Sequence, residues 1–162
     1  MKYMLCLLLF VGTVLTCSLW YLGFRYDATG SLNHPFYLRS DRVTYKSGDI
    51  ILFCPTESQN ATATYKNRQW AFLALCKNRI FPYLKRVVQV GGQRIRIDNN
   101  QLFIDQQSIG KPLPKDWQSR PIPVVVNADL VYVEGDHPYS NDSRLYGGIN
   151  PAQIVSVMKP VF

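Results

Sequence analysis

The sequence has few of the residues on which most metal and cofactor sites depend. Among its 162 residues there are four cysteines and only two histidines, His34 and His137. It contains no metal-ligand motif, no phosphate-binding loop and no dinucleotide-binding fingerprint. Neither histidine lies in a recognisable nucleophile context, so a Ser-His-Asp triad has no visible support. We therefore expect no metal and no cofactor, and a chemistry that uses other side chains.

Charge is missing from the first part of the chain. Lys2 is the only charged residue before Arg25, so residues 3–24 form one uncharged, largely apolar run. At about 1.5 Å per residue this run makes a helix of roughly 33 Å, which is enough to cross a hydrocarbon core of about 30 Å. A Trp-Tyr pair near its end suits the membrane interface. The sequence predicts a retained membrane anchor over residues 1–24, with a cleaved signal peptide as the alternative.

The distribution of charge predicts an orientation and a partner. Lys2 and the amino terminus flank the start of the anchor, so the positive-inside tendency puts residues 25–162 outside the cytoplasm. The formal net charge is +7, and the basic residues are scattered along the chain. This scatter favours attraction to an anionic membrane surface over binding of nucleic acid.

Residues 25–162 read as strands. Short apolar runs and strict alternation predict strands at 49–53, 84–90, 94–97, 101–104, 124–126, 130–133 and 154–157. An Asp-Asn-Asn turn joins two of these into a hairpin over residues 94–104. Residues 65–79 form a candidate helix, and the prolines of residues 109–123 predict an ordered loop. The predicted fold class is mainly β, with antiparallel curled sheets.

Lys85 is a candidate general base. A lysine near its ordinary pKa of about 10.4 is protonated at pH 7, but burial among apolar groups lowers the pKa and frees the amine. Lys85 lies in such an apolar run, between Tyr83-Leu84 and Val87-Val88. The alternative is that Lys85 and Arg86 both extend to solvent.

Three separated segments resemble the conserved boxes of bacterial signal peptidase I, in the family's order. Residues 29–32, Thr-Gly-Ser-Leu, resemble the nucleophile box, and residues 84–88, followed by Gly91-Gly92, resemble the lysine box. Gly135-Asp136 and residues 140–147, Ser-Asn-Asp-Ser-Arg-Leu-Tyr-Gly, resemble the closing box. The resemblance implies a partly open barrel of the signal peptidase type.

Within that family the chain looks most like the TraF-type peptidases of conjugative plasmids. Those are short, have one anchor and commonly carry a Phe-Cys-Pro element, here residues 53–55. The resemblance implies a single-pass protein of the bacterial inner membrane with a periplasmic peptidase domain. It further implies that the partner is a secreted precursor such as a pilin, which some of these enzymes make cyclic. The alternatives are a non-catalytic pilus-assembly or scaffold protein and a housekeeping signal peptidase.

The resemblance assigns roles to individual residues. Ser31 is the predicted nucleophile and Lys85 its base. The backbone N–H of Ser31 and the hydroxyl of Thr29 are the predicted oxyanion donors. Asp142 and Ser143 are expected to position the lysine, and Arg144 to brace the box by ion pairing.

The match has departures, and they leave alternatives open. Pro35 follows Ser31 by four residues, farther than the family's proline, and Gln93 takes the place of an acidic residue in the lysine box. Ser40 and Ser47 therefore remain conceivable nucleophiles, although neither has the Gly-Ser-Leu context.

The cysteines allow two interpretations. Two lie in the anchor, and Cys54 and Cys76 lie in the soluble part. An oxidising compartment makes a disulfide between Cys54 and Cys76 plausible, and two buried thiols are the alternative.

Overall fold

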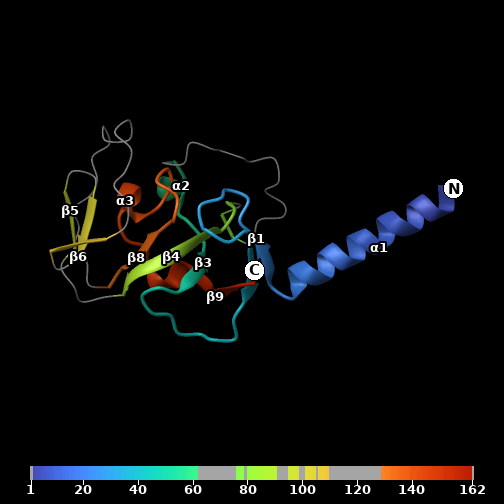
Figure 1. Cartoon of the computed structure of the whole chain (residues 1–162), viewed down its shortest axis with the longest axis horizontal. Helices are drawn as coiled ribbons and strands as arrows, with labels where there is room; N and C mark the ends of the chain where they lie inside the picture. The colour runs from blue at the N-terminus through green and yellow to red at the C-terminus, as the bar shows by residue number, and fades with distance from the viewer. Residues whose placement is uncertain are drawn as a thin grey trace.

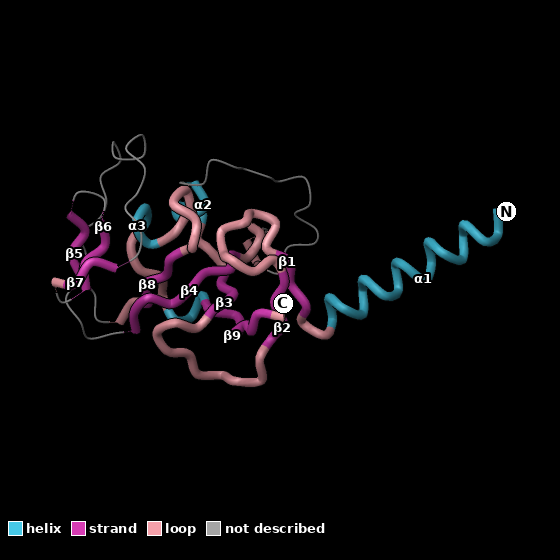
Figure 2. Tube along the Cα trace, in the orientation of Figure 1, coloured by secondary structure: helices cyan, strands magenta, loops and turns pink. Residues whose placement is uncertain are grey.

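The computed structural model describes residues 2–61, 76–78, 80–90, 95–98, 101–104, 106–109 and 129–161. Strands dominate the described part beyond the first helix, as Figures 1 and 2 show. The helices are α1 (Lys2–Tyr21), α2 (Glu57–Ala61) and α3 (Ser143–Tyr146), with a 3₁₀ turn at Pro151–Gln153. The strands are β1 (Phe24–Tyr26), β2 (Phe36–Arg39), β3 (Ile50–Phe53), β4 (Tyr83–Val90), β5 (Ile95–Asp98), β6 (Gln101–Ile104), β7 (Gln107–Ile109), β8 (Val131–Glu134) and β9 (Ile154–Pro160).

The main sheet has six strands in the order β1-β2-β9-β3-β4-β8. Every neighbouring pair is antiparallel, and β1 and β8 form the two edges of an open sheet. The predicted antiparallel, mainly β fold is confirmed. Strands β3, β4, β8 and β9 all overlap runs that the sequence predicted.

A second sheet of three strands, β5-β6-β7, lies at the opposite end of the molecule from α1 (Figure 1). Its first two strands pair from Ile95 with Ile104 to Asp98 with Gln101. This is the hairpin predicted over residues 94–104, and it is confirmed. Strand β7 extends it and was not predicted.

Helix α1 projects away from the main sheet (Figure 1), and residues 3–21 are long and apolar enough to cross a membrane. The predicted anchor of residues 1–24 runs past its end. The reason is pairing: Phe24 already lies opposite Leu38 in the β1–β2 ladder, and the Gly23 carbonyl accepts the Arg39 N–H at 3.1 Å. The last residues of the apolar run thus begin the sheet.

Apolar residues cover both faces of the main sheet. Their positions follow the alternation of β-strands, in which successive side chains point to opposite faces. One cluster contains Leu32, Tyr37, Ile50, Leu52, Leu84 and Met158, and the other contains Ile51, Phe53, Val87, Val131, Val133 and Ile149. Strand β4 contributes to both clusters, so Lys85 lies on a strand that is packed on each side.

Some predictions fall outside the described residues. These are most of the candidate helix at 65–79, nearly all of the proline-containing loop at 109–123 and the strand at 124–126. The short helices α2 and α3 were not predicted.

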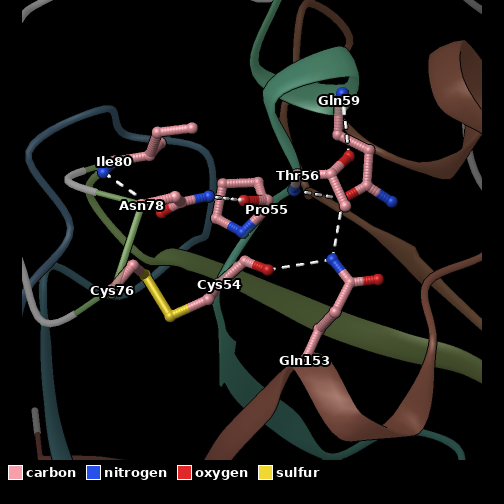
Figure 3. Close-up of a disulfide and its surroundings, with 8 residues drawn as sticks. All are labelled: Cys54, Pro55, Thr56, Gln59, Cys76, Asn78, Ile80 and Gln153. Carbon is pink, nitrogen blue, oxygen red and sulfur yellow. Dashed lines mark hydrogen bonds between the residues drawn. A yellow bond between two sulfur atoms is a disulfide. The ribbon is translucent and has the colours of Figure 1, made fainter.

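Cys54 and Cys76 are joined by a disulfide, with 5.5 Å between their Cα atoms (Figure 3). Cys54 follows β3, and its backbone exchanges hydrogen bonds with Gln153 before β9. On the other side of the bond, the Asn78 amide donates to the Pro55 carbonyl at 2.7 Å. The disulfide therefore fastens the segment before β4 to the end of β3.

We expect Cys54 and Cys76 to resist thiol labelling in unreduced protein from the membrane fraction. Cys6 and Cys17 of α1 have free thiols and are internal controls, because they should label once the chain is denatured. Changing Cys54 to Ser should lower the free energy of unfolding by roughly 3 kcal/mol, since the closed loop spans 22 residues. Activity per folded molecule should change less. Labelling of all four cysteines without reductant would contradict this prediction.

Candidate active site

The loop of residues 27–35 connects β1 to β2 and carries Ser31; we call it the nucleophile loop. Its two ends are tied together, because the Asp27 N–H donates to the Pro35 carbonyl at 2.8 Å. A turn follows Asp27, whose carbonyl accepts the Gly30 N–H at 3.4 Å. Gly30 has φ of +61°, a left-handed conformation that glycine adopts without steric cost. The Gly-Ser sequence therefore fits this turn.

The Ser31 side chain is buried, with 5% of the residue exposed. The backbone after β8 lies against the backbone of Ser31, because the His137 N–H donates to the Ser31 carbonyl at 3.2 Å. A methyl group on Gly135 would collide with the Ser140 side chain and would come within 2.8 Å of the Ser31 carbonyl oxygen. The residue at 135 must therefore be glycine for the closing box to reach the nucleophile loop.

A second contact holds the same two segments together. The Asp136 carboxylate accepts the Asn33 N–H at 2.9 Å. It also accepts hydrogen bonds from the Nε and one Nη of Arg86, at 3.1 and 3.0 Å. Arg86, next to Lys85 on β4, thus links the lysine strand to the nucleophile loop through one carboxylate.

Lys85 is buried, with 4% of the residue exposed, and lies opposite Ile51 of β3. Burial lowers the pKa of Lys85 to about 8, against the opposing effects of Asp142 and Asp27 and with a smaller lowering by Arg144. At pH 7 roughly a tenth of the amines are then neutral, far more than for an exposed lysine. The expected burial of Lys85 is found, and the solvent-exposed alternative does not describe it.

The Ser31 hydroxyl is hydrogen-bonded to Asp27 in this structure. Its Oγ lies 3.3 Å from an Asp27 carboxylate oxygen, and no hydrogen bond joins it to the Lys85 amine. The two candidate residues nevertheless share neighbours, because Asp27 also acts electrostatically on Lys85. Catalytic hydrogen bonds are often long or absent in free enzymes and tighten when substrate binds. The Ser31–Lys85 dyad stays a prediction.

The predicted oxyanion donors are turned toward each other. The Ser31 N–H donates to Thr29 Oγ1 at 3.3 Å, and the Thr29 hydroxyl donates to Asp27 at 2.6 Å. Both groups lie on one loop beside the nucleophile, as the sequence comparison implied. Their role in binding an oxyanion stays a prediction.

Arg144 and Asp142 form a fully buried ion pair. Arg144 Nε donates to one Asp142 oxygen at 2.8 Å, and an Nη lies 2.6 Å from the other. Glu134 lies 3.4 Å from the same guanidinium. Asp142 also accepts the Gly135 N–H at 3.0 Å, so the pair fixes the backbone that packs on Ser31.

Asp142 and Ser143 differ in what they contact. Asp142 is one of the charges that act on Lys85, and it raises the pKa of that lysine against the effect of burial. Ser143 Oγ instead accepts the Val133 N–H of β8 at 2.9 Å. Its observed contact is therefore with the neighbouring strand.

The other candidate nucleophiles form hydrogen bonds away from Ser31, one within a turn and one to strand β4. Ser40 Oγ accepts the Arg42 N–H at 3.3 Å, and Ser47 Oγ donates to the Val88 carbonyl at 3.1 Å. Neither shares a hydrogen-bond partner with Ser31.

Two residues of the site were not singled out from the sequence. Asp27 is buried and hydrogen-bonded to the nucleophile loop through both of its carboxylate oxygens. Ser140 belongs to the closing box, and its hydroxyl is buried without a hydrogen-bond partner in the described part of the chain. The Asp-x-Thr spacing at residues 27–29 is a turn signal that could have indicated the first.

The described residues include side chains of the kinds that nucleophilic acyl transfer uses. A buried serine lies on a tight loop, a buried lysine has a depressed pKa, and an N–H and a hydroxyl lie beside the serine. Buried acidic groups surround the lysine and offset part of the cost of its charge.

Comparison with known proteins identifies a family. The family model described as "Signal peptidase, peptidase S26" matches residues 2–162. The chain is 28% identical to a probable conjugal transfer protein TraF of Sinorhizobium fredii, over 93% of this chain and 82% of that one. It is 24% identical to a plasmid transfer protein TraF of Escherichia coli, over 86% and 82%.

A solved structure is also similar. The signal peptidase I of Enterococcus faecalis matches 72% of this chain and 97% of its own, with a TM-score of 0.42 and 17% identity. Because the family model covers the chain from residue 2 to its last residue, this protein belongs to the signal peptidase family, peptidase S26.

Proposed function

We propose that this protein is a membrane-anchored serine peptidase that uses Ser31 and Lys85 to process a secreted precursor. One observation carries the proposal: Asp27 is hydrogen-bonded to a buried serine hydroxyl and also acts electrostatically on a buried lysine with a pKa of about 8. Such an amine can accept a proton near neutral pH, which an exposed lysine does poorly.

The proposed reaction has two steps. The Ser31 hydroxyl transfers its proton to the neutral Lys85 amine, and its oxygen attacks the scissile carbonyl carbon. The resulting oxyanion is bound by the Ser31 N–H and the Thr29 hydroxyl. The scissile C–N bond breaks, and the leaving amine takes the proton from the Lys85 ammonium. Water, or an amine of the substrate, then attacks the acyl-enzyme and releases Ser31.

The anchor and the relatives support a setting at the inner membrane, with the catalytic domain in the periplasm. Helix α1 is long and apolar enough to span the inner membrane, and the Cys54–Cys76 disulfide suits a catalytic domain in the periplasm. That relatives are named as conjugal or plasmid transfer proteins supports our proposal that the precursor is a conjugative pilin. An amine at the pilin's own amino end would give a cyclic product.

The test uses the purified full chain, the pilin precursor from the same host and mass spectrometry of the product. Cleavage by water is expected to give a mature linear chain, and cyclisation a product lighter by one water. Ser31→Ala protein is the matched control and should leave the precursor intact. Equal processing of unrelated signal-bearing precursors would instead favour a housekeeping signal peptidase.

A non-catalytic scaffold is the second candidate function. The observation that favours it is the resting hydrogen bond of Ser31 to Asp27, with none to Lys85. If the protein is a scaffold, its Ser31→Ala variant should support pilus assembly as well as the unchanged protein does. If the protein is a peptidase, this variant should fail to support assembly. Complementation of a deletion strain by the two forms separates these functions.

A further inference from the structure

Asp27 is the most heavily hydrogen-bonded side chain of the nucleophile loop. One carboxylate oxygen accepts the Thr29 N–H at 3.1 Å and the Thr29 hydroxyl at 2.6 Å. The other accepts the Leu32 N–H at 2.9 Å and lies 3.3 Å from Ser31 Oγ. The residue is 7% exposed, so these bonds have little competition from water. Four groups of the loop thus converge on one carboxylate.

The two hydroxyl bonds to Asp27 differ in length, and this difference decides which hydroxyl turns away from Asp27 more easily. Hydroxyl-to-carboxylate bonds are normally about 2.5–2.7 Å long, so the Thr29 bond is strong and the Ser31 bond is weak. The Thr29 hydroxyl has a single hydrogen, and it points to Asp27. It can donate to a substrate oxyanion only after rotating away from Asp27, whereas the loosely held Ser31 hydroxyl turns easily.

We propose that Asp27 is a positioning residue with two roles. Its hydrogen bonds hold the nucleophile loop in a resting conformation, and its carboxylate places a negative charge near the general base. The inference rests on the proposed function of Ser31 and Lys85. In this resting conformation the Thr29 and Ser31 hydroxyls face Asp27. Substrate binding moves the Thr29 hydroxyl to the oxyanion and the Ser31 hydroxyl to Lys85, while the N–H groups of Thr29 and Leu32 keep the loop folded on the carboxylate.

The charged groups around Lys85 make the role of Asp27 measurable. Asp142 and Arg144 approach from the closing box, Asp136 from the segment after β8, and Asp27 from the nucleophile loop. The three carboxylates favour the ammonium, while Arg144 and burial disfavour it. Removing the charge of Asp27 should therefore lower the pKa of Lys85 below about 8.

The decisive variant is Asp27→Asn in the full chain. An amide keeps one oxygen for the two Thr29 groups but has no charge, and its NH2 cannot accept the Leu32 N–H; the loop therefore keeps both Thr29 bonds while the electrostatics change. The titration midpoint of Lys85, followed by NMR of its side chain in detergent and assigned with Lys85→Met, should move to lower pH. The acid limb of the kcat/KM profile should move in the same direction. Asp41→Asn is the matched control, because Asp41 is exposed and should move neither.

Asp27→Ala removes both the charge and the loop contacts. It should lower kcat/KM by roughly 100-fold, as expected when a reacting group is displaced by about 1 Å. Should this variant fail to accumulate, Asp27→Asn carries the test alone.

The outcomes separate this inference from the proposed function. If Asp27→Asn reduces the rate but leaves the Lys85 midpoint and the acid limb unchanged, Asp27 is merely structural and the inference is overturned. Inactive Ser31→Ala and Lys85→Ala proteins would leave the proposed function standing in that case. Full cleavage by Ser31→Ala or Lys85→Ala would instead overturn the proposed function, whatever Asp27→Asn does.

Discussion

Ser31→Ala and Lys85→Ala are each expected to lose precursor cleavage by a factor of at least about 1,000, while the protein still accumulates in the membrane. The first change removes the attacking oxygen, and the second removes the group that takes its proton. Both residues are buried; Ser31→Ala deletes one oxygen, whereas Lys85→Ala deletes the whole side chain beyond Cβ, so each rate is normalised to the amount of folded protein in the membrane. The measurement is kcat/KM with the pilin precursor.

The double variant tests whether the two residues act as a unit. Residues that share one chemical step are strongly non-additive, so Ser31→Ala combined with Lys85→Ala should be no slower than either single variant. Independent contributions would instead multiply the two losses.

Matched controls come from the turn before β3. Ser47→Ala and Lys46→Ala remove the same groups from exposed positions outside the site, and both should retain cleavage. Ser40→Ala should also retain cleavage. Retained cleavage in Ser40→Ala and Ser47→Ala would exclude both serines as the nucleophile. Loss of activity in Ser40→Ala or Ser47→Ala, with activity retained in Ser31→Ala, would move the nucleophile and refute the assignment.

The strands that the sequence predicted best are those with continuous apolar or β-branched runs. Strands β3 and β8 are buried at every position, so their sequences carry a strong signal. Strands β1 and β2 went unnoticed because they lack this signal: no residue of β1 is buried, and Tyr37 is the one buried residue of β2. Phe24 lies at the end of the anchor's apolar run, and its strand is supported by contacts distant in sequence, such as the Phe24–Phe36 ring pair at 5.5 Å. A local pattern cannot show such pairing.

The site divides in the same way. The boxes around Ser31, Lys85 and Arg144 carry a family pattern, so comparison of short segments was enough to find them. Asp27 is bonded to Ser31 and Leu32 because the chain turns back on itself within a few residues. Its position beside Lys85 depends on the pairing of β1 with β2 and on the packing of the sheet. Ser140 was within a recognised box, but its hydroxyl is buried and has no hydrogen-bond partner among the described residues, which only a structure reveals.

Arg144→Met should be the most destabilising single change in the closing box. The guanidinium is fully buried and neutralises Asp142 and, at longer range, Glu134. Removing it takes away the cation that is hydrogen-bonded to buried Asp142, and breaking such a buried pair typically costs about 3–5 kcal/mol. Arg144→Lys should recover part of the loss, because an ammonium restores the charge but not the two-pronged contact with Asp142. The measurement is the free energy of unfolding of the full chain in detergent.

The control is an ion pair of equal length at the surface. Arg42 and Asp49 are also 2.6 Å apart, but the Arg42 side chain is 40% exposed, whereas that of Arg144 is 0% exposed. Exposed pairs contribute roughly 0–1 kcal/mol, so Arg42→Met should change the free energy of unfolding little. The comparison holds the shortest distance between the charges equal, while burial and the additional contacts of Arg144 with Asp142 and Glu134 differ. Equal and small losses for Arg144→Met and Arg42→Met would mean that the closing box is held by its backbone contacts, and that the buried charges serve Lys85 alone.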